Sequence, residues 1–302
     1  MVSIRGLDVA TRRPALSAPP AGEGRLRPVE RLLLGYVAVT SALAATRLAR
    51  FPQCGWLILA NGLIAALVWL VSRRSPGRAA AALREIYPLL LLLPLYGGLD
   101  ILNGGGRVPV HDAMIQRWEA WLFGGQPSRD WWRAAPSPVW SVILHGAYFG
   151  YYLIIALPPL ALIARRDVPG LRRLLFAIIA AFVPCYLCFA FFPVAGPYYA
   201  FPRPEGDFVH NPMARLVYAT LATGSSYGAA FPSSHVAVSA AATWACWRAW
   251  RPLGGALLVA TALLTVSVVY CQMHYAVDAL AGLVVGLVVG AAATRKSVSR
   301  KR

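Results

Sequence analysis

Charged residues and cysteines are both scarce in this chain of 302 residues. Only 14% of the residues are charged, whereas soluble globular proteins average about 25%. The 12 acidic residues are outnumbered by 29 lysines and arginines, which gives a formal net charge of +17. The five cysteines are odd in number and most lie inside apolar runs, so they imply no disulfide framework. These scarcities exclude a soluble single-domain protein and a disulfide-rich secreted domain.

Apolar sequence is abundant, at 58% hydrophobic residues. A strong positive charge often indicates nucleic-acid binding, but long uncharged runs require lipid around them. We therefore expect an all-α, polytopic transmembrane helical bundle and no nucleic-acid partner. The eight expected spans cover residues 32–50, 55–72, 86–103, 138–163, 171–192, 233–250, 254–271 and 275–294.

The positive charges are unevenly divided between the two sides of such a bundle. With eight spans, 21 of the 29 lysines and arginines fall in the two tails and in the connections on the same side as the tails. The positive-inside rule then predicts a multi-pass cell-membrane protein with both termini in the cytoplasm. The same charges predict contact with anionic lipids of the inner leaflet. The long segments 104–137 and 193–232 are then extracytoplasmic, as are all five histidines or the span ends that carry them.

Two short polar segments begin spans on the outer side. One is Phe231-Pro232-Ser233-Ser234-His235, and the other is His274-Tyr275-Ala276-Val277-Asp278. Both spans run in the same direction, so both present helix N-termini to one layer. Free N–H groups and the positive end of the helix dipole make such a layer a binding site for anions, phosphate above all.

Three ionisable residues in these segments predict an active site. His274 and Asp278 are four residues apart and share one helix face. A carboxylate inside a span is costly unless it has a partner, so we expect Asp278 to accept the imidazole N–H of His274. The other nitrogen of His274 is then a nucleophile, and His235 is placed to protonate a leaving oxygen.

The two segments resemble the second and third signatures of the type 2 phosphatidic acid phosphatase (PAP2) superfamily. The forms G-A-A-F-P-S-S-H and H-Y-x-x-D are most similar to its inositol phosphorylceramide synthase branch. The stretch from Asp112 to Pro127, which contains Glu119, is also similar to that branch. The resemblance implies a six-helix core over 86–294. It leaves two accessory helices over 32–85 and two basic cytoplasmic tails, over 1–31 and 295–302. We expect the first of these tails to be disordered.

The resemblance also implies a chemistry, a phosphohistidine reaction without metal or cofactor. His274 matches the nucleophile, Asp278 its orienting partner and His235 the general acid. The residues that match the phosphate cradle are Ser233, Ser234 and Arg203.

Two cations of the usual signatures are missing. Gly196 stands where a lysine is expected, and Val268 stands where an arginine is expected. A phosphate monoester carries two charges and needs several fixed cations, whereas a phosphodiester carries one. The departure therefore favours diester substrates or headgroup transfer. The outer-side arginines that we expect to replace the missing cations are Arg107, Arg117, Arg129 and Arg133.

Several alternatives stay open at this point. Hydrolysis and transfer differ only in whether water or a lipid hydroxyl attacks the intermediate, so a simple phosphatase of phosphatidic acid or polyprenyl phosphate is the first alternative. A transporter with a His/Asp proton relay and a zinc site of two histidines and an aspartate are the others. The glycines at 282, 286 and 290 predict close packing of two spans within the chain, or else a homodimer face, so the protein is expected to be a monomer or a homodimer.

Overall fold

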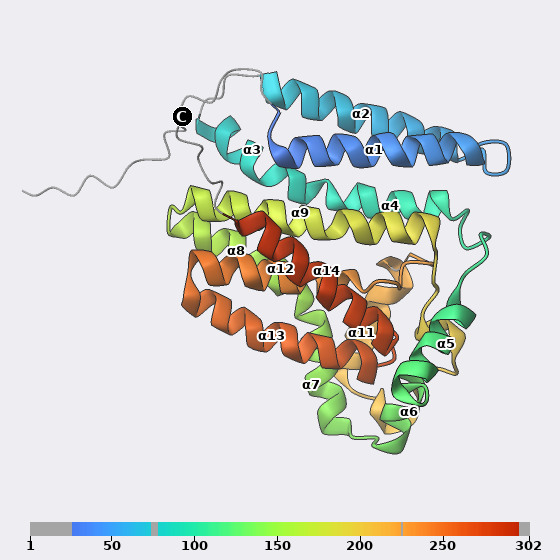
Figure 1. Ribbon diagram of the computed structural model, residues 1–302. Coiled ribbons are helices and arrows are strands. Elements are labelled where there is room, and N and C mark those ends of the chain that lie inside the picture. The colour runs from blue at the N-terminus through green and yellow to red at the C-terminus, as the bar shows by residue number, and fades with distance from the viewer. Residues whose placement is uncertain (1–25, 74–77, 225, 296–302) are drawn as a thin grey trace, which may run out of the picture.

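The computed structural model describes residues 26–73, 78–224 and 226–295. Over these ranges the chain is a bundle of helices without named strands, which confirms the predicted fold class (Figure 1). The elements are α1 (Pro28–Arg47), α2 (Cys54–Arg73), α3 (Arg78–Leu90), α4 (Leu92–Leu102), α5 (Asp112–Phe123), α6 (Pro127–Ala134), α7 (Pro138–Phe149), α8 (Tyr151–Ala164), α9 (Val168–Phe191), α10 (Pro197–Ala200), the 3-10 turn η1 (Gly206–Phe208), α11 (Pro212–Gly224), α12 (Ser234–Ala249), α13 (Arg251–Tyr270) and α14 (Ala276–Thr294).

Most of the expected spans are present by length and composition. Within the described ranges, α1, α2, α9, α13 and α14 are long and apolar enough to cross a membrane, and so is the segment Leu83–Leu102 of α3 and α4. Helices α7 and α8 form a further candidate that is bent by 46°. The expected tails lie mostly outside the described residues, but residues 28–31 form the first turn of α1, where Pro28 and Glu30 favour a helix start.

The sixth expected span, 233–250, differs from its prediction. Helix α12 has 16 residues, which is about 24 Å at 1.5 Å per residue, less than the roughly 30 Å of a bilayer core. Ser233 caps its start. At its other end Trp250 leaves the helical conformation, and Arg251 begins α13 with Pro252 in its first turn. The helix is short because both ends carry strong boundary signals.

Helix α12 lies at the centre of the bundle and packs against α8, α9, α13 and α14 (Figure 1). Its contact with α14 depends on the three glycines. A Cβ atom at Gly282 would collide with the Ser233 carbonyl oxygen, and one at Gly286 would collide with the Ala237 carbonyl oxygen. The predicted packing between these two helices is confirmed, and this stripe is covered within the chain.

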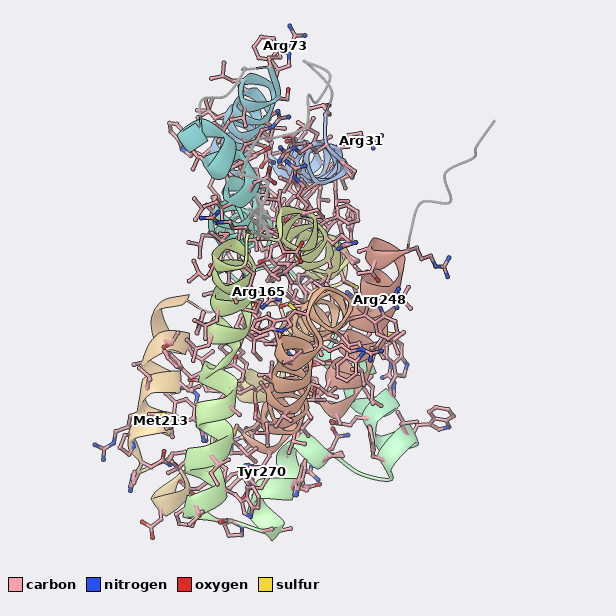
Figure 2. The ribbon with its side chains drawn as sticks, turned by 90° about the vertical axis from the view of Figure 1, so that its left-hand side faces the viewer. Arg31, Arg73, Arg165, Met213, Arg248 and Tyr270 are labelled. Carbon is pink, nitrogen blue, oxygen red and sulfur yellow. The ribbon has the colours of Figure 1, made fainter. Side chains whose placement is uncertain are left out.

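The arginines of the predicted cytoplasmic set gather at one end of the bundle. Arg31, Arg73, Arg165 and Arg248 lie at or near helix ends that face the viewer in Figure 2. The opposite end carries α5 and α6 beside the start of α14 (Figure 1).

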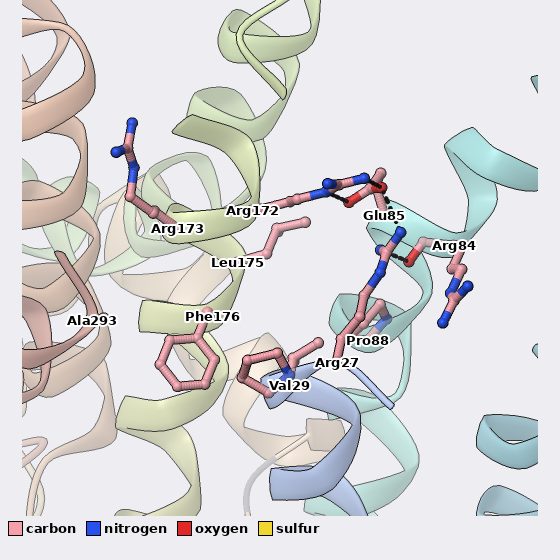
Figure 3. Close-up of a pocket in the computed structure, with 11 residues that line it drawn as sticks. Arg27, Val29, Arg84, Glu85, Pro88, Arg172, Arg173, Leu175, Phe176 and Ala293 are labelled. Carbon is pink, nitrogen blue, oxygen red and sulfur yellow. Dashed lines mark hydrogen bonds and ion pairs between the residues drawn. The ribbon is translucent and has the colours of Figure 1, made fainter. Parts of the chain in front are cut away.

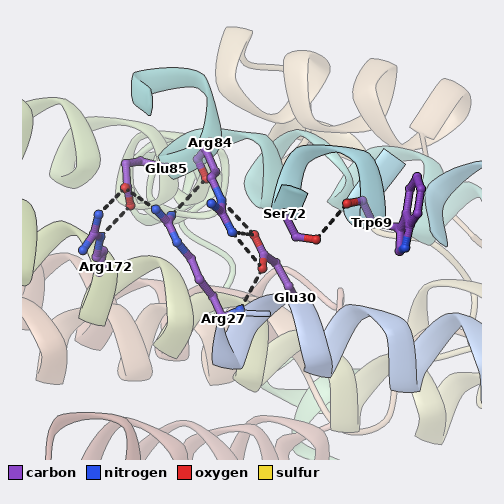
Figure 4. A network of polar contacts seen from close by, with 7 residues as sticks. All are labelled: Arg27, Glu30, Trp69, Ser72, Arg84, Glu85 and Arg172. Atoms are coloured by element: carbon purple, nitrogen blue, oxygen red, sulfur yellow. Dashed lines mark hydrogen bonds and ion pairs between the residues drawn. The ribbon is translucent and has the colours of Figure 1, made fainter. Parts of the chain in front are cut away.

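Two carboxylates, Glu30, which is buried, and Glu85, which is partly buried, join α1 to the rest of the bundle at the arginine-rich end (Figure 4). Glu85 of α3 accepts hydrogen bonds from Arg172 of α9 at 2.6 and 3.0 Å and from Arg27 at 3.0 Å. Glu30 of α1 accepts bonds from the Arg84 guanidinium at 3.2 Å and from the Arg27 backbone N–H at 2.7 Å. The network therefore joins the starts of α1 and α9 to the middle of α3.

The glycine packing predicts the effect of one added methyl group. Gly286→Ala places a Cβ against backbone atoms of α12 that cannot rotate away, so we expect it to lower the free energy of unfolding by about 1–3 kcal/mol. Thermal unfolding in detergent measures the change. Gly62→Ala on α2 is the matched control, because no atom lies within 4 Å of its Cβ position. Equal unfolding midpoints for both variants would contradict the close contact.

The carboxylate network predicts a loss of stability when its charge is removed. Glu85→Gln keeps the shape of the side chain but leaves Arg27 and Arg172 without their anion, so we expect a loss of about 2 kcal/mol, seen as a lower unfolding midpoint. Asp130→Asn is the control, because the Arg129–Asp130 pair is about half exposed to solvent and such pairs contribute little. A Glu85→Gln midpoint equal to that of wild type would show that the network does not fasten these helices.

Candidate active site

The turn between α13 and α14 sets the position of His274. Its backbone folds back on the end of α13, where the N–H groups of Met273 and His274 both donate to the Val268 carbonyl, at 2.9 and 2.8 Å. Gln272 takes a positive φ of 58° to make this turn. Helix α14 then starts with Tyr275 as its N-cap residue, and the Tyr275 N–H donates to the Asp278 carboxylate at 2.9 Å. This capping bond fixes the turn against the helix that follows.

The hydrogen bonds of His274 determine which of its nitrogens is free. Nδ1 lies 3.0 Å from the Ala230 carbonyl oxygen and 3.5 Å from the Asp278 carboxylate. Since a carbonyl oxygen only accepts, Nδ1 carries the proton and Nε2 keeps its lone pair. Burial lowers the pKa of His274 to about 4, so the imidazole is neutral at neutral pH. Asp278 is fully buried and is the second, longer neighbour of Nδ1.

His235 faces this lone pair from the first turn of α12. Its Nδ1 lies 3.5 Å from Nε2 of His274, and its ring packs against Tyr148 and Tyr151, with ring centroids 5.0 and 4.4 Å apart. The structure thus brings together the three residues predicted to be catalytic. The two helix starts are joined directly, because the Ser233 N–H donates to the Asp278 carbonyl at 3.0 Å.

Of the three residues predicted to bind phosphate, one lies in the cavity wall and two do not. Ser233 is fully buried and its hydroxyl accepts the Val236 N–H at 3.4 Å, as expected of an N-cap. Ser234 lines a cavity together with both histidines. Arg203 does not line it; its guanidinium lies over the ring of Tyr198, 4.4 Å from the centroid, and Tyr198 is part of the cavity wall.

The cavity has a volume of about 540 Å³ and runs from the histidines between α4, α8 and α11. Aliphatic and aromatic side chains dominate its wall, and none of the lining residues is a lysine or an arginine. The polar groups of the wall beside the histidines are therefore the start of α12 and tyrosine hydroxyls, without a side-chain cation. Besides Tyr148 and Tyr151, the tyrosines of the wall are Tyr96, Tyr152, Tyr186, Tyr198 and Tyr199.

The four arginines considered as substitutes for the missing cations lie outside the lining. Arg129 pairs with Asp130, and Arg107 donates to the Gly104 carbonyl at 2.8 Å. Arg133 contacts the turn that carries His274, because it donates to the Gln272 side chain at 3.1 Å. Among the described residues, no group of three or more His, Cys, Asp or Glu side chains has a geometry that could hold a metal ion.

Helix α5 carries residues of the site to which the sequence assigned no role. Tyr275, next to His274, donates its hydroxyl to Asp112 at 3.0 Å and accepts a bond from Gln116 at 3.0 Å. Glu119 accepts the N–H of Ala276 at 2.7 Å. Asp112 and Glu119 are seven residues apart on one helix face, in a chain with few acids, and this spacing is the signal that identifies them.

These features define a membrane-embedded helical bundle with two histidines, one buried and one partly buried, at the N-terminal ends of two adjacent helices. The family model described as the PAP2 superfamily matches residues 113–292, which is more than half of the chain and includes both histidines and Asp278. The chain belongs to the PAP2 superfamily. No curated protein and no solved structure matches it.

Proposed function

We propose that this protein is an integral-membrane phosphotransferase or phosphatase that acts on a lipid phosphoester through a phosphohistidine at His274. The observation that carries the proposal is the free Nε2 of His274, which faces His235 at the end of a tyrosine-rich cavity. Membership of the PAP2 superfamily supports a phosphoryl-transfer reaction, and the apolar cavity supports a lipid substrate.

The reaction has two steps that share the same groups. Nε2 of His274 attacks phosphorus, the bond from phosphorus to the leaving oxygen breaks, and protonated His235 gives its proton to that oxygen. Water or a lipid hydroxyl then gives a proton to His235 and attacks phosphorus, which frees His274. The Ala230 carbonyl and Asp278 stabilise the positive charge that the phosphorylated imidazole carries. Attack and departure lie roughly in line, so the imidazoles must separate beyond 3.5 Å to admit the phosphoryl group.

A phosphodiester fits the cavity better than a phosphate monoester. A dianionic monoester requires more fixed positive charge than a cavity without lysine or arginine supplies. For this reason we favour headgroup transfer of the inositol phosphorylceramide synthase type, with a lipid hydroxyl as acceptor. Hydrolysis of phosphatidic acid or polyprenyl phosphate is the alternative. We place the reaction at the extracytoplasmic face, since the arginine-rich end of the bundle is the opposite one.

The arginine-rich end supports the proposal that inner-leaflet lipids contact this protein. A pocket of about 420 Å³ opens there (Figure 3). Its wall combines Arg173 with apolar side chains such as Phe176. It also contains Arg27, Arg84, Arg172 and the Glu85 carboxylate that pairs with Arg27 and Arg172. Basic side chains beside apolar ones suit the headgroup and upper acyl chain of an anionic phospholipid.

The phosphohistidine step predicts the behaviour of the histidine variants. Purified protein is incubated with labelled phospholipids, with and without hydroxylated lipid acceptors. We expect His274→Ala to lose turnover and covalent label, and His235→Ala to lose about 10²–10⁴-fold in rate, the usual contribution of a general acid. His210→Ala, an exposed histidine outside the cavity, is the control and should match wild type. Free phosphate identifies a phosphatase, and a new labelled lipid identifies a transferase.

Full turnover by His274→Ala would overturn the proposed mechanism. Movement of a proton or another ion across vesicles by the wild-type protein, without any lipid turnover, would favour the transporter alternative. Loss of turnover on chelation would favour a metal site.

The position of Arg203 predicts a contribution to substrate binding. Its guanidinium lies one side chain behind the cavity wall, over Tyr198, so a phosphate headgroup can attract it into the cavity. We expect Arg203→Ala to lower kcat/KM about tenfold, the effect of losing one charge-assisted hydrogen bond. Arg215→Ala on α11 is the matched control, because Arg215 is exposed and lies outside the cavity lining. Equal kcat/KM values for the two variants would exclude Arg203 as a phosphate ligand.

A further inference from the structure

The two carboxylates of α5, Glu119 and Asp112, are connected to His274 by two separate sets of hydrogen bonds. The first set involves Glu119, whose side chain is fully buried. One carboxylate oxygen accepts the N–H of Ala276, the first residue of α14, at 2.7 Å, and the other accepts the Ser128 hydroxyl of α6 at 3.2 Å. A carboxylate at this point satisfies a free N–H of the helix start and lies at the positive end of its dipole. Glu119 therefore fixes the backbone two residues after His274.

The second set of hydrogen bonds involves Asp112, at the other end of the same face of α5. Its carboxylate accepts the N–H groups of Ala195 and Gly196, both at 2.8 Å, in addition to the Tyr275 hydroxyl. The segment that it holds is bridged to the residue that orients His274, because the Ala230 N–H donates to the Val194 carbonyl at 2.9 Å. Asp112 therefore fixes the carbonyl that sets the tautomer of His274.

Neither carboxylate lines the cavity, so neither meets the substrate. Resting on the proposed phosphohistidine function, we propose that Asp112 and Glu119 are positioning residues that hold the turn carrying His274 in its reactive geometry. They act through Tyr275, Ala276 and the Ala195–Gly196 backbone.

Glu119 differs from an ordinary surface carboxylate in a way that makes its role measurable. Burial, and after it the negative charge of Asp278, raise the pKa of Glu119 to about 7. The other charged or titratable groups around it are Asp112 on its own helix, Tyr275 before α14, and Arg129 on α6, which pairs with Asp130. Below this pKa the carboxyl gains a proton and accepts the Ala276 N–H less strongly. The reaction rate is then expected to rise with pH through about 7.

The test compares Glu119→Gln with wild type in the full-length protein in detergent, on the labelled lipid that wild type turns over. We expect Glu119→Gln to lower kcat about 10–100-fold, the effect of a small misplacement of the reacting group, with KM unchanged. The acid limb of the kcat profile near pH 7 should disappear. Glu205→Gln, an exposed glutamate outside the cavity lining, is the matched control and should keep both.

A second variant changes the pKa of Glu119 without removing its carboxyl group. The Ser128 hydroxyl donates to Glu119 and stabilises its ionised form. Ser128→Ala should therefore move the acid limb to higher pH, a shift that a merely destabilised protein does not produce. This variant keeps the proposal testable if Glu119→Gln fails to fold.

Two results would overturn the positioning role. One is a Glu119→Gln variant with the kcat and pH profile of wild type, and the other is a Ser128→Ala variant whose acid limb does not move. Failure of the proposed function is seen separately, since it requires His274→Ala to remain active. An inactive His274→Ala beside an unaffected Glu119→Gln would reject the role of α5 alone.

Discussion

The close approach of α12 and α14 is the constraint on which the site depends. The Ser233 N–H donates to the Asp278 carbonyl, and Gly282 offers no side chain where the Ser233 carbonyl oxygen lies. His235 follows Ser233 by two residues and His274 precedes Asp278 by four. The distance between the two imidazoles is therefore set by a contact between helix backbones, which is stiffer than any contact between their flexible side chains.

The rest of the bundle supports this contact from two sides. At the histidine end, α5 holds the turn before α14 and the segment before α10 through Asp112 and Glu119. At the arginine-rich end, Glu30 and Glu85 join the starts of α1 and α9 to the middle of α3. Helix α9 runs between the two ends and packs on both α12 and α14, so it connects the arginine-rich end to the helices that carry the histidines.

The sequence predicted the bundle and the proximity of His235 to His274. The lengths of the apolar runs predict the spans, and the order of the spans determines the direction of each one. It did not identify Ala230 as the first partner of Nδ1, since any residue supplies a backbone carbonyl and the side chain carries no sign of it. The contact of Glu119 with Ala276 joins positions 157 residues apart. No local pattern encodes such a contact. The seven-residue spacing of Asp112 and Glu119 is a signal only that both lie on one helix face.

The charges around the site also bear on the substrate. Three buried carboxylates lie around the start of α14 and outside the cavity lining: Asp112, Glu119 and Asp278. Among the described residues that line the cavity there is no lysine or arginine. The start of α14 is already compensated by Glu119 and Asp278, so the positive potential available to a phosphate comes from the start of α12, worth about half an elementary charge, and from a histidine that gains a second proton. This small potential supports the proposed preference for a singly charged phosphodiester. The second charge of a monoester would lie near these carboxylates without a counterion, so the groups that we propose to position His274 also support the proposed preference for a diester.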